Sequence, residues 1–247
     1  MSKTVALVTG SNRGIGASCI EEFAKQGVSV IINYCHREKE AREFERRIRE
    51  QYGVDTMVIQ CDISKEEEVE LMVNRIVDRF GGIDILVNNA SVCRDKLLMD
   101  KNIREFKRIL DVNVVGTYLC SKYVGKVMQE KKRGRIINIS STNAIDTYYP
   151  ESCDYDASKA GIISLTHNFA RELAPFITVN CICPGWVKTA MNKDLSIDQI
   201  NEEKKKILLG RFAEPEEIAK IVVFLASSKA NYINDSIIRV DGGKYNG

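Results

Sequence analysis

Short apolar runs alternate with longer amphipathic stretches along most of the chain. The first run, residues 4–9, is followed at residues 13–25 by apolar side chains at helical spacing. Continued alternation predicts strands at residues 28–33, 56–61, 83–87, 134–140, 178–182 and 236–240, helices at 38–52, 66–80, 152–173 and 215–226, and a long helical region ending near residue 131. Only residues 192–206 read as a polar segment of weak structure. Strands alternating with helices predict βαβ units, so we expect an α/β fold with a parallel sheet covered by helices on both faces.

Length, composition and charge exclude several classes of protein but do not indicate a function. The 247 residues show no repeat, low-complexity tract or linker, so residues 1–247 are predicted to form a single domain. Because 36 basic residues balance 34 acidic ones, for a net charge of +2, neither nucleic acid nor an anionic membrane is expected as a partner. No run of 18 apolar residues predicts a membrane span, and the start of the chain does not resemble a signal peptide.

The eight cysteines do not resemble a disulfide framework or a zinc site. Most lie inside apolar or helical stretches, none forms CxxC, and the chain has only two histidines. We therefore expect no metal, and mostly buried, reduced thiols in a cytoplasmic protein.

A glycine-rich turn joins the first predicted strand to the first predicted helix. Its spacing is GxxxGxG, where the common dinucleotide fingerprint is GxGxxG. Glycines let the backbone approach a pyrophosphate, and the N-terminus of the following helix favours the negative charge. Three glycines are a weak signal alone, but their place in a βαβ unit favours dinucleotide binding. The expected cofactor contacts in this turn are Gly10, Ser11, Asn12, Arg13, Gly14, Ile15 and Gly16.

The residues after the second predicted strand bear on which dinucleotide binds. An acid there would hold the ribose 2′-hydroxyl of NAD, but the chain carries Cys35, His36 and Arg37, with no acid before Glu38. Together with Arg13 these residues would suit a 2′-phosphate, so we expect NADP(H). The alternative is that Arg37 only opens the exposed charged face of the next helix.

Polar residues also follow the third and fourth predicted strands, where ligands bind in sheets of this kind. Asp62 and Ile63 could bracket the adenine, or Asp62 could be only a helix-entry residue. Asn89, Ala90 and Ser91 could line the cofactor pocket, although a turn alone would also favour asparagine.

Two tyrosine–lysine pairs have the spacing YxxxK, which places both side chains on one helix face. They are Tyr155 with Lys159 and Tyr118 with Lys122. An ammonium near a phenol favours phenolate and so lowers the tyrosine pKa. Such a phenol can exchange a proton with a carbonyl or carbinol oxygen.

At this point the chain resembles the short-chain dehydrogenase/reductase family over essentially its whole length. The matching set, in chain order, is residues 9–16, 88–90, Asn113, Ser141, Tyr155, Lys159 and 184–185. No member is specific alone, but the set is highly specific. The resemblance implies a Rossmann-type, doubly wound parallel sheet of about seven strands and an assembly of two or four subunits, for which we expect a homotetramer.

The family also implies roles for these residues. Tyr155 resembles the catalytic acid/base, and Lys159 the residue that tunes it and holds the nicotinamide ribose. Ser141 resembles the group that orients the substrate oxygen, and Asn113 the residue that anchors a proton-relay water. Further expected cofactor contacts are Pro184, Gly185, Val187 and Thr189, besides Tyr155 and Lys159.

Context separates the two YxxxK pairs. Tyr155 lies 14 residues after Ser141, at the end of a predicted strand, whereas Tyr118 has no such serine upstream and is predicted to serve packing. Ser140 could replace Ser141, but the family spacing between serine and tyrosine fits Ser141 more closely.

Within the family, residues 91–98, 209–212 and 215–217 resemble 3-oxoacyl-carrier-protein reductases. Four departures stand against this match. Ser91 replaces a glycine, the loop 147–153 is one residue longer and bulkier, residues 175–177 lack a glycine, and residues 234–235 replace Thr-Gly.

The expected function is therefore NADPH-dependent reduction of a carbonyl group, with a 3-oxoacyl thioester as the favoured substrate. The substrate could be linked to an acyl carrier protein, as in fatty acid biosynthesis. The alternatives are reduction of another ketone, sugar or steroid, and a catalytically silent dinucleotide-binding regulator on the same fold.

Overall fold

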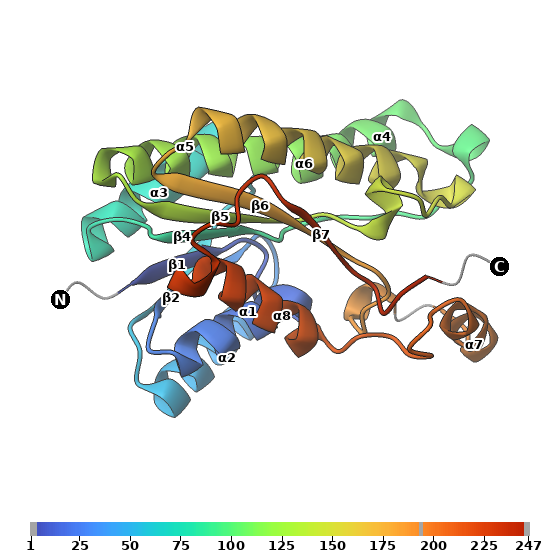
Figure 1. Ribbon diagram of the computed structural model, residues 1–247, viewed down its shortest axis with the longest axis horizontal. Helices are drawn as coiled ribbons and strands as arrows, with labels where there is room; N and C mark the ends of the chain where they lie inside the picture. The colour runs from blue at the N-terminus through green and yellow to red at the C-terminus, as the bar shows by residue number, and fades with distance from the viewer. Residues whose placement is uncertain (1–3, 193–194, 245–247) are drawn as a thin grey trace.

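A computed structural model describes residues 4–192 and 195–244, and in this part of the chain seven strands form one parallel sheet (Figure 1). The strand order is β3-β2-β1-β4-β5-β6-β7. The strands are β1 (Val5–Val8), β2 (Ser29–Tyr34), β3 (Thr56–Gln60), β4 (Ile85–Asn88), β5 (Gly134–Ile139), β6 (Ile177–Pro184) and β7 (Ile237–Val240). The predicted α/β class and the doubly wound parallel sheet are confirmed.

Helices cover both faces of the sheet, as Figure 1 shows. One layer contains α1 (Gly14–Lys25), α2 (Glu38–Tyr52) and α8 (Pro215–Ala226), and the other contains α3 (Glu66–Phe80), α4 (Ile103–Leu110), α5 (Gly116–Lys131) and α6 (Cys153–Glu172). Successive side chains of β1 point to opposite layers, so Ala6 and Val8 join one core while Val5 and Leu7 join the other. Both faces of the strand are buried, which explains its uninterrupted apolar sequence.

The chain reverses its direction of winding between β1 and β4, which lie side by side at the centre of the sheet. The segments that follow these two strands therefore meet. The Thr9 hydroxyl accepts hydrogen bonds from the backbone N–H groups of Asn89 and Ala90, both at 3.0 Å. This contact joins the glycine-rich turn to the end of β4 and creates the crevice in which doubly wound sheets bind their ligands.

The helical region between β4 and β5 is divided into separate pieces. A short 3₁₀ turn (Leu98–Asp100) precedes α4, and a π-helical turn (Asp111–Val115) connects α4 to α5. Such π-helical turns are frequent at functional sites, and this one contains Asn113.

The prediction of weak structure at residues 192–206 was wrong, because α7 (Ile197–Lys205) is a helix. Ser196 caps it, since its hydroxyl accepts from the Gln199 N–H at 3.2 Å while the Gln199 side chain accepts from the Ser196 N–H at 2.9 Å. None of its side chains is fully buried, so the segment has no apolar stripe by which the pattern could reveal a helix.

The eight cysteines are all free thiols. Five of them are buried, namely Cys19, Cys61, Cys120, Cys181 and Cys183. Among the described residues, no cluster of three side chains could hold a metal ion, and no helix is long and apolar enough to cross a membrane.

Candidate active site

The structure brings the four predicted catalytic residues together at the carboxyl ends of β4 and β5. Tyr155 and Lys159 lie one turn apart on α6, with the Lys159 ammonium nitrogen 5.3 Å from the centre of the Tyr155 ring. Ser141 is the second residue after β5, and Asn113 lies in the π-helical turn. The Asn113 amide donates to the Ser158 hydroxyl at 2.9 Å, and Ser158 in turn donates to the Tyr155 carbonyl at 2.7 Å.

Lys159 is only 2% exposed, and its Nζ donates to the Ile139 carbonyl at 2.9 Å. Burial disfavours the charged form and lowers the pKa of Lys159 to about 8. The neighbouring Ser140 hydroxyl donates to the Lys159 carbonyl at 2.8 Å. Ser140 therefore serves to hold α6 against β5, which leaves Ser141 as the serine available to a substrate.

The expectation that the pKa of Tyr155 is lowered was wrong for the protein without bound cofactor. Desolvation raises the pKa of Tyr155 well above its usual range, and the carboxylates of Asp156 and Asp95 act in the same direction, while a hydrogen bond with Ser141 lowers it. The nearby Lys159 ammonium does not outweigh this desolvation, because burial also disfavours the charged form of the lysine. A phenol that stays protonated at neutral pH is suited to donate a proton.

Ser141 is 8% exposed and is oriented by the loop that follows it. Its hydroxyl donates to Asn143 Oδ1 at 3.0 Å and accepts from the Asn143 N–H at 3.2 Å. The Asn143 amide donates to Asp156 Oδ1 at 2.6 Å. This chain of hydrogen bonds joins the serine after β5 to the helix that carries Tyr155.

Asn113 is fully buried and bridges three segments. Besides its contact with Ser158, its amide exchanges hydrogen bonds with the backbone of Val92, where Oδ1 accepts at 2.9 Å and Nδ2 donates at 3.0 Å. The side chain thereby ties the segment after β4 to α6.

The second YxxxK pair lies elsewhere. Tyr118 is 43% exposed and its ring packs 6.1 Å from that of Phe169, while Lys122 pairs with Glu66 on α3 at 2.7 Å. These contacts agree with the packing role predicted for Tyr118.

The glycine-rich turn is shaped as a cradle for a pyrophosphate. A Cβ atom on Gly10 would lie 2.8 Å from the Ala90 Cα, and one on Gly16 would lie 2.6 Å from the Asn89 side chain. Gly10 also has a positive φ of 60°, which favours glycine. α1 begins at Gly14, within this turn, so its first N–H groups face the crevice where an anion is stabilised. The turn fits a dinucleotide.

Each of the two predicted cations directly precedes a helix. Arg13 is the exposed N-cap residue of α1, and Arg37 precedes α2 with a positive φ of 66°. The Arg37 guanidinium is 57% exposed and lies 3.4 Å from Glu40, so its present ion pair is weak. His36 is exposed next to it, with its ring 3.7 Å from the Cys35 sulfur.

Asp62, predicted to bracket the adenine, is held by Ser64 and by Arg108 of α4. It accepts from the Ser64 N–H and hydroxyl at 3.1 and 2.7 Å and pairs with Arg108 of α4 at 3.1 Å. These bonds fit the helix-entry alternative. Ile63 is buried against Gly116, where a Cβ would lie 2.6 Å from the isoleucine side chain.

The last predicted cofactor contacts follow β6. Gly185 is backed by β7 through a 3.0 Å hydrogen bond to the Val240 carbonyl. Val187 is buried, and Thr189 lies against the glycine-rich turn, since a Cβ on Gly14 would be 3.6 Å from its methyl carbon. The segment after β6 thus faces the cradle after β1.

Sequence reasoning missed Trp186 and Glu203, whereas Tyr149 and Phe212 lie in the stretches 147–153 and 209–212 that it had singled out. Tyr149 and Trp186 both donate to the same Glu203 oxygen on α7, each at 3.0 Å, and the Trp186 ring stacks on Phe212 at 5.3 Å. The single tryptophan directly after Pro184-Gly185 was the only available signal, because the partner on α7 lies 17 residues further along the chain.

Sequence comparison places this architecture among known proteins. Residues 10–245 match the model of the family described as Enoyl-(Acyl carrier protein) reductase. The chain is 40% identical to the "3-oxoacyl-[acyl-carrier-protein] reductase FabG" of Staphylococcus epidermidis, with 97% of this chain and 98% of the relative covered. The same protein from Staphylococcus aureus is 40% identical, with 97% of each chain covered, and that from Aquifex aeolicus is 38% identical, with 98% and 97% covered.

These matches extend over nearly the full length of both partners and include the glycine-rich turn and the tyrosine–lysine helix. The site geometry agrees with a nicotinamide-dependent oxidoreductase. The chain belongs to the short-chain dehydrogenase/reductase family.

Proposed function

We propose that this protein is an NADPH-dependent reductase that converts a 3-oxoacyl thioester into the 3-hydroxyacyl form. The observation that carries the proposal is that the protonated phenol of Tyr155 lies beside Lys159 and Ser141. The named relatives act on 3-oxoacyl groups, and they match the chain from end to end.

The reaction needs a hydride, a proton and a place for negative charge. When bound, NADPH supplies the hydride to the carbonyl carbon. Tyr155 donates its phenolic proton to the carbonyl oxygen as the C=O double bond becomes a single bond. Ser141 donates a hydrogen bond to the same oxygen, where stabilisation of developing charge lowers the barrier.

Lys159 and Asn113 support this proton transfer. The Lys159 ammonium would hold the nicotinamide ribose and stabilise the phenolate that Tyr155 becomes. Asn113 would anchor the water through which the phenolate regains its proton. Both side chains are buried and hydrogen-bonded, so they enter the reaction already oriented.

Preference for NADPH over NADH rests on charge. Arg13 and Arg37 flank the end of β2, where no acid precedes Glu38. Guanidinium groups pair well with phosphate. The exposed Arg37 would give up only its weak ion pair with Glu40 to bind the 2′-phosphate.

The assembly is a homotetramer, which the helix surfaces support, and its compartment is the cytoplasm. On α5 Leu119 is buried against the sheet, while Tyr118 is 43% exposed, and Val115 at the end of the preceding π-helical turn is 39% exposed. On α6 Ile162 is likewise buried. The exposed apolar positions would be covered by a neighbouring subunit across a two-fold axis.

The test is NADPH oxidation by the purified protein with acetoacetyl-CoA, followed by a panel of cyclic ketones, sugars and steroids. Turnover of the thioester above the others supports the proposal. Turnover only of a cyclic or sugar ketone would move the protein to that substrate class. Dinucleotide binding without turnover of any carbonyl would identify a silent regulator.

A further inference from the structure

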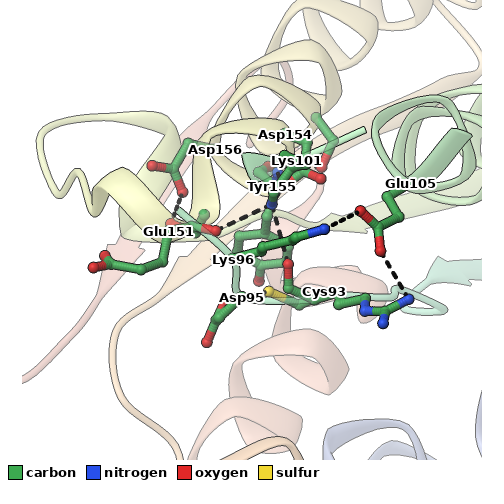
Figure 2. A network of polar contacts seen from close by, with 12 residues as sticks. Cys93, Asp95, Lys96, Lys101, Glu105, Glu151, Asp154, Tyr155 and Asp156 are labelled. Atoms are coloured by element: carbon green, nitrogen blue, oxygen red, sulfur yellow. Dashed lines mark hydrogen bonds and ion pairs between the residues drawn. The ribbon is translucent and has the colours of Figure 1, made fainter. Parts of the chain in front are cut away.

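A buried ion pair lies directly beside the catalytic tyrosine, outside the set of residues discussed above. The Nζ of Lys101 is 2.5 Å from Oδ1 of Asp154, and the two side chains are only 3% and 1% exposed. Figure 2 shows the pair next to Tyr155, between the segment that follows β4 and the start of α6.

Lys101 holds three parts of the chain at once. Besides Asp154, its ammonium donates to the backbone carbonyls of Arg94 at 3.0 Å and Glu151 at 3.1 Å. An ammonium has three protons, so its hydrogen bonds are complete. The segment from Arg94 to Lys101 is thereby fastened to the residues that begin α6, and the Lys96 N–H adds a 3.0 Å bond to the Glu151 carbonyl.

Asp154 connects this anchor to Tyr155. Its Oδ1 also accepts from the Tyr155 N–H at 2.8 Å, while Oδ2 is buried and has no hydrogen-bond partner among the described residues. The carboxylate charge is therefore compensated mainly by the Lys101 ammonium.

The surroundings of Tyr155 are already rich in charge. From α6, from the segment after β4 and from the loop after β5, the groups that act on its phenol or lie by its ring are Lys159, Asp156, Cys93, Asp95 and Ser141. Asp154, paired with Lys101, contacts the backbone N–H of Tyr155. In a site of low dielectric constant one further unpaired charge would act strongly on the phenol. Loss of one member of a buried pair leaves such a charge.

We propose that Lys101 and Asp154 are positioning residues for the reduction: their ion pair holds the segment 94–101 against the first turn of α6 and cancels the charge that either would place beside Tyr155. This inference rests on the proposed function, because it requires Tyr155 to be the proton donor.

Three variants test it through the pH dependence of kcat/KM for carbonyl reduction. At alkaline pH kcat/KM falls, because the proton donor loses its proton. Asp154→Asn leaves the Lys101 charge unpaired, favours phenolate, and should move this fall to lower pH by about one unit. Lys101→Met leaves the Asp154 charge unpaired and should move the fall to higher pH. The double variant Lys101→Met/Asp154→Asn carries no net charge here and should return close to the wild-type position.

A purely structural pair would give a different result. All three variants would then lose activity and thermal stability while the alkaline fall stayed at the wild-type pH, and that outcome would overturn the inference. If Lys101→Met does not fold, Asp154→Asn and the double variant still decide. Only a charge effect shifts the alkaline fall of kcat/KM in Asp154→Asn and restores it in the double variant.

The matched control is Lys122→Met, which removes the same type of side chain from the ion pair with Glu66 at 2.7 Å and should leave the profile unchanged. Failure of the inference differs from failure of the proposed function. If an active wild type and its variants have the same pH profile of kcat/KM, only the role of the ion pair is rejected. If the wild type reduces no carbonyl, the proposed function is rejected and this inference with it.

Discussion

The Lys159 ammonium nitrogen lies 5.3 Å from the centre of the Tyr155 ring, with Lys159 buried and Tyr155 half-buried. Burial favours the neutral form of each group, so the pKa of the lysine falls while that of the tyrosine rises. The pair thus begins with a proton on the phenol, as a reduction requires, and an anion bound nearby would strengthen the charge on Lys159.

Tyr155→Phe should abolish most turnover while dinucleotide binding and the fold persist. The variant removes only the hydroxyl that donates the proton, and general acid catalysis contributes about 10²–10⁴-fold. Steady-state NADPH oxidation measures the loss, and equilibrium binding of NADPH checks the cofactor site. The matched control is Tyr118→Phe, at a 43% exposed position in the other YxxxK pair, which should keep nearly full activity. Reversed behaviour of the two variants would place the site on α5.

Replacing both Arg13 and Arg37 by glutamine should raise the KM for NADPH far more than that for NADH. The two guanidiniums are expected to pair with the 2′-phosphate, which NADH lacks. Arg47→Gln is a suitable control, because this exposed arginine of α2 pairs with Glu21 at 2.6 Å. Equal wild-type efficiency with the two dinucleotides would contradict the assignment.

The carrier protein should give little advantage over a small thioester. Lys132 at the end of α5 could meet an acidic carrier. Its ammonium lies 5.8 Å from the Phe176 ring, and this apolar residue supplies no further positive charge for such a partner. We expect similar kcat/KM values for acetoacetyl-carrier protein and acetoacetyl-CoA, and little change in Lys132→Glu. A large preference for the carrier that Lys132→Glu abolishes would instead show a dedicated enzyme of fatty acid synthesis.

The protein should be a tetramer in solution. Tyr118 of α5 and Val115 of the preceding π-helical turn expose apolar surface, while the other face of α5 already covers the sheet. Light scattering at micromolar concentration gives the mass directly, and Val115→Glu should shift it toward smaller species by placing a charge in the contact. A monomeric mass for the wild type would rule this assembly out.

Stability should depend on pH through Lys159. Its pKa is 10.5 when exposed and about 8 in the folded protein, so between these values the unfolded chain binds more protons and stability rises with pH. Below pH 8 the full cost applies, about 3 kcal/mol for this shift. Lys159→Met removes the cost, so its advantage in free energy of unfolding over the wild type should be larger at pH 7 than at pH 9.5. Urea denaturation measures both, with Lys122→Met expected to show no such trend. A constant difference across this range would contradict the assignment.

The local pattern of the chain was sufficient to predict the sheet, most of the helices and the cofactor cradle. Apolar runs buried on both faces and helical spacing recur within each element, and the glycines at positions 10, 14 and 16 follow directly after the first strand. Such signals lie within about 15 residues of one another, so propensity and periodicity can reveal them. Local signals did not reveal α7, because its largely polar sequence has no apolar positions repeating at helical spacing.

The tertiary structure alone decided which contacts each polar side chain makes. Tyr118 and Tyr155 share the spacing YxxxK, yet only Tyr155 is packed beside a serine after β5 and among carboxylates. Lys101 meets Asp154 across 53 residues of chain, and Asn113 meets Ser158 across 45. In each pair, the local sequence around one residue does not predict its partner. Burial and the pKa values that depend on it arise only when distant segments close around a group, because desolvation is a property of the assembled environment.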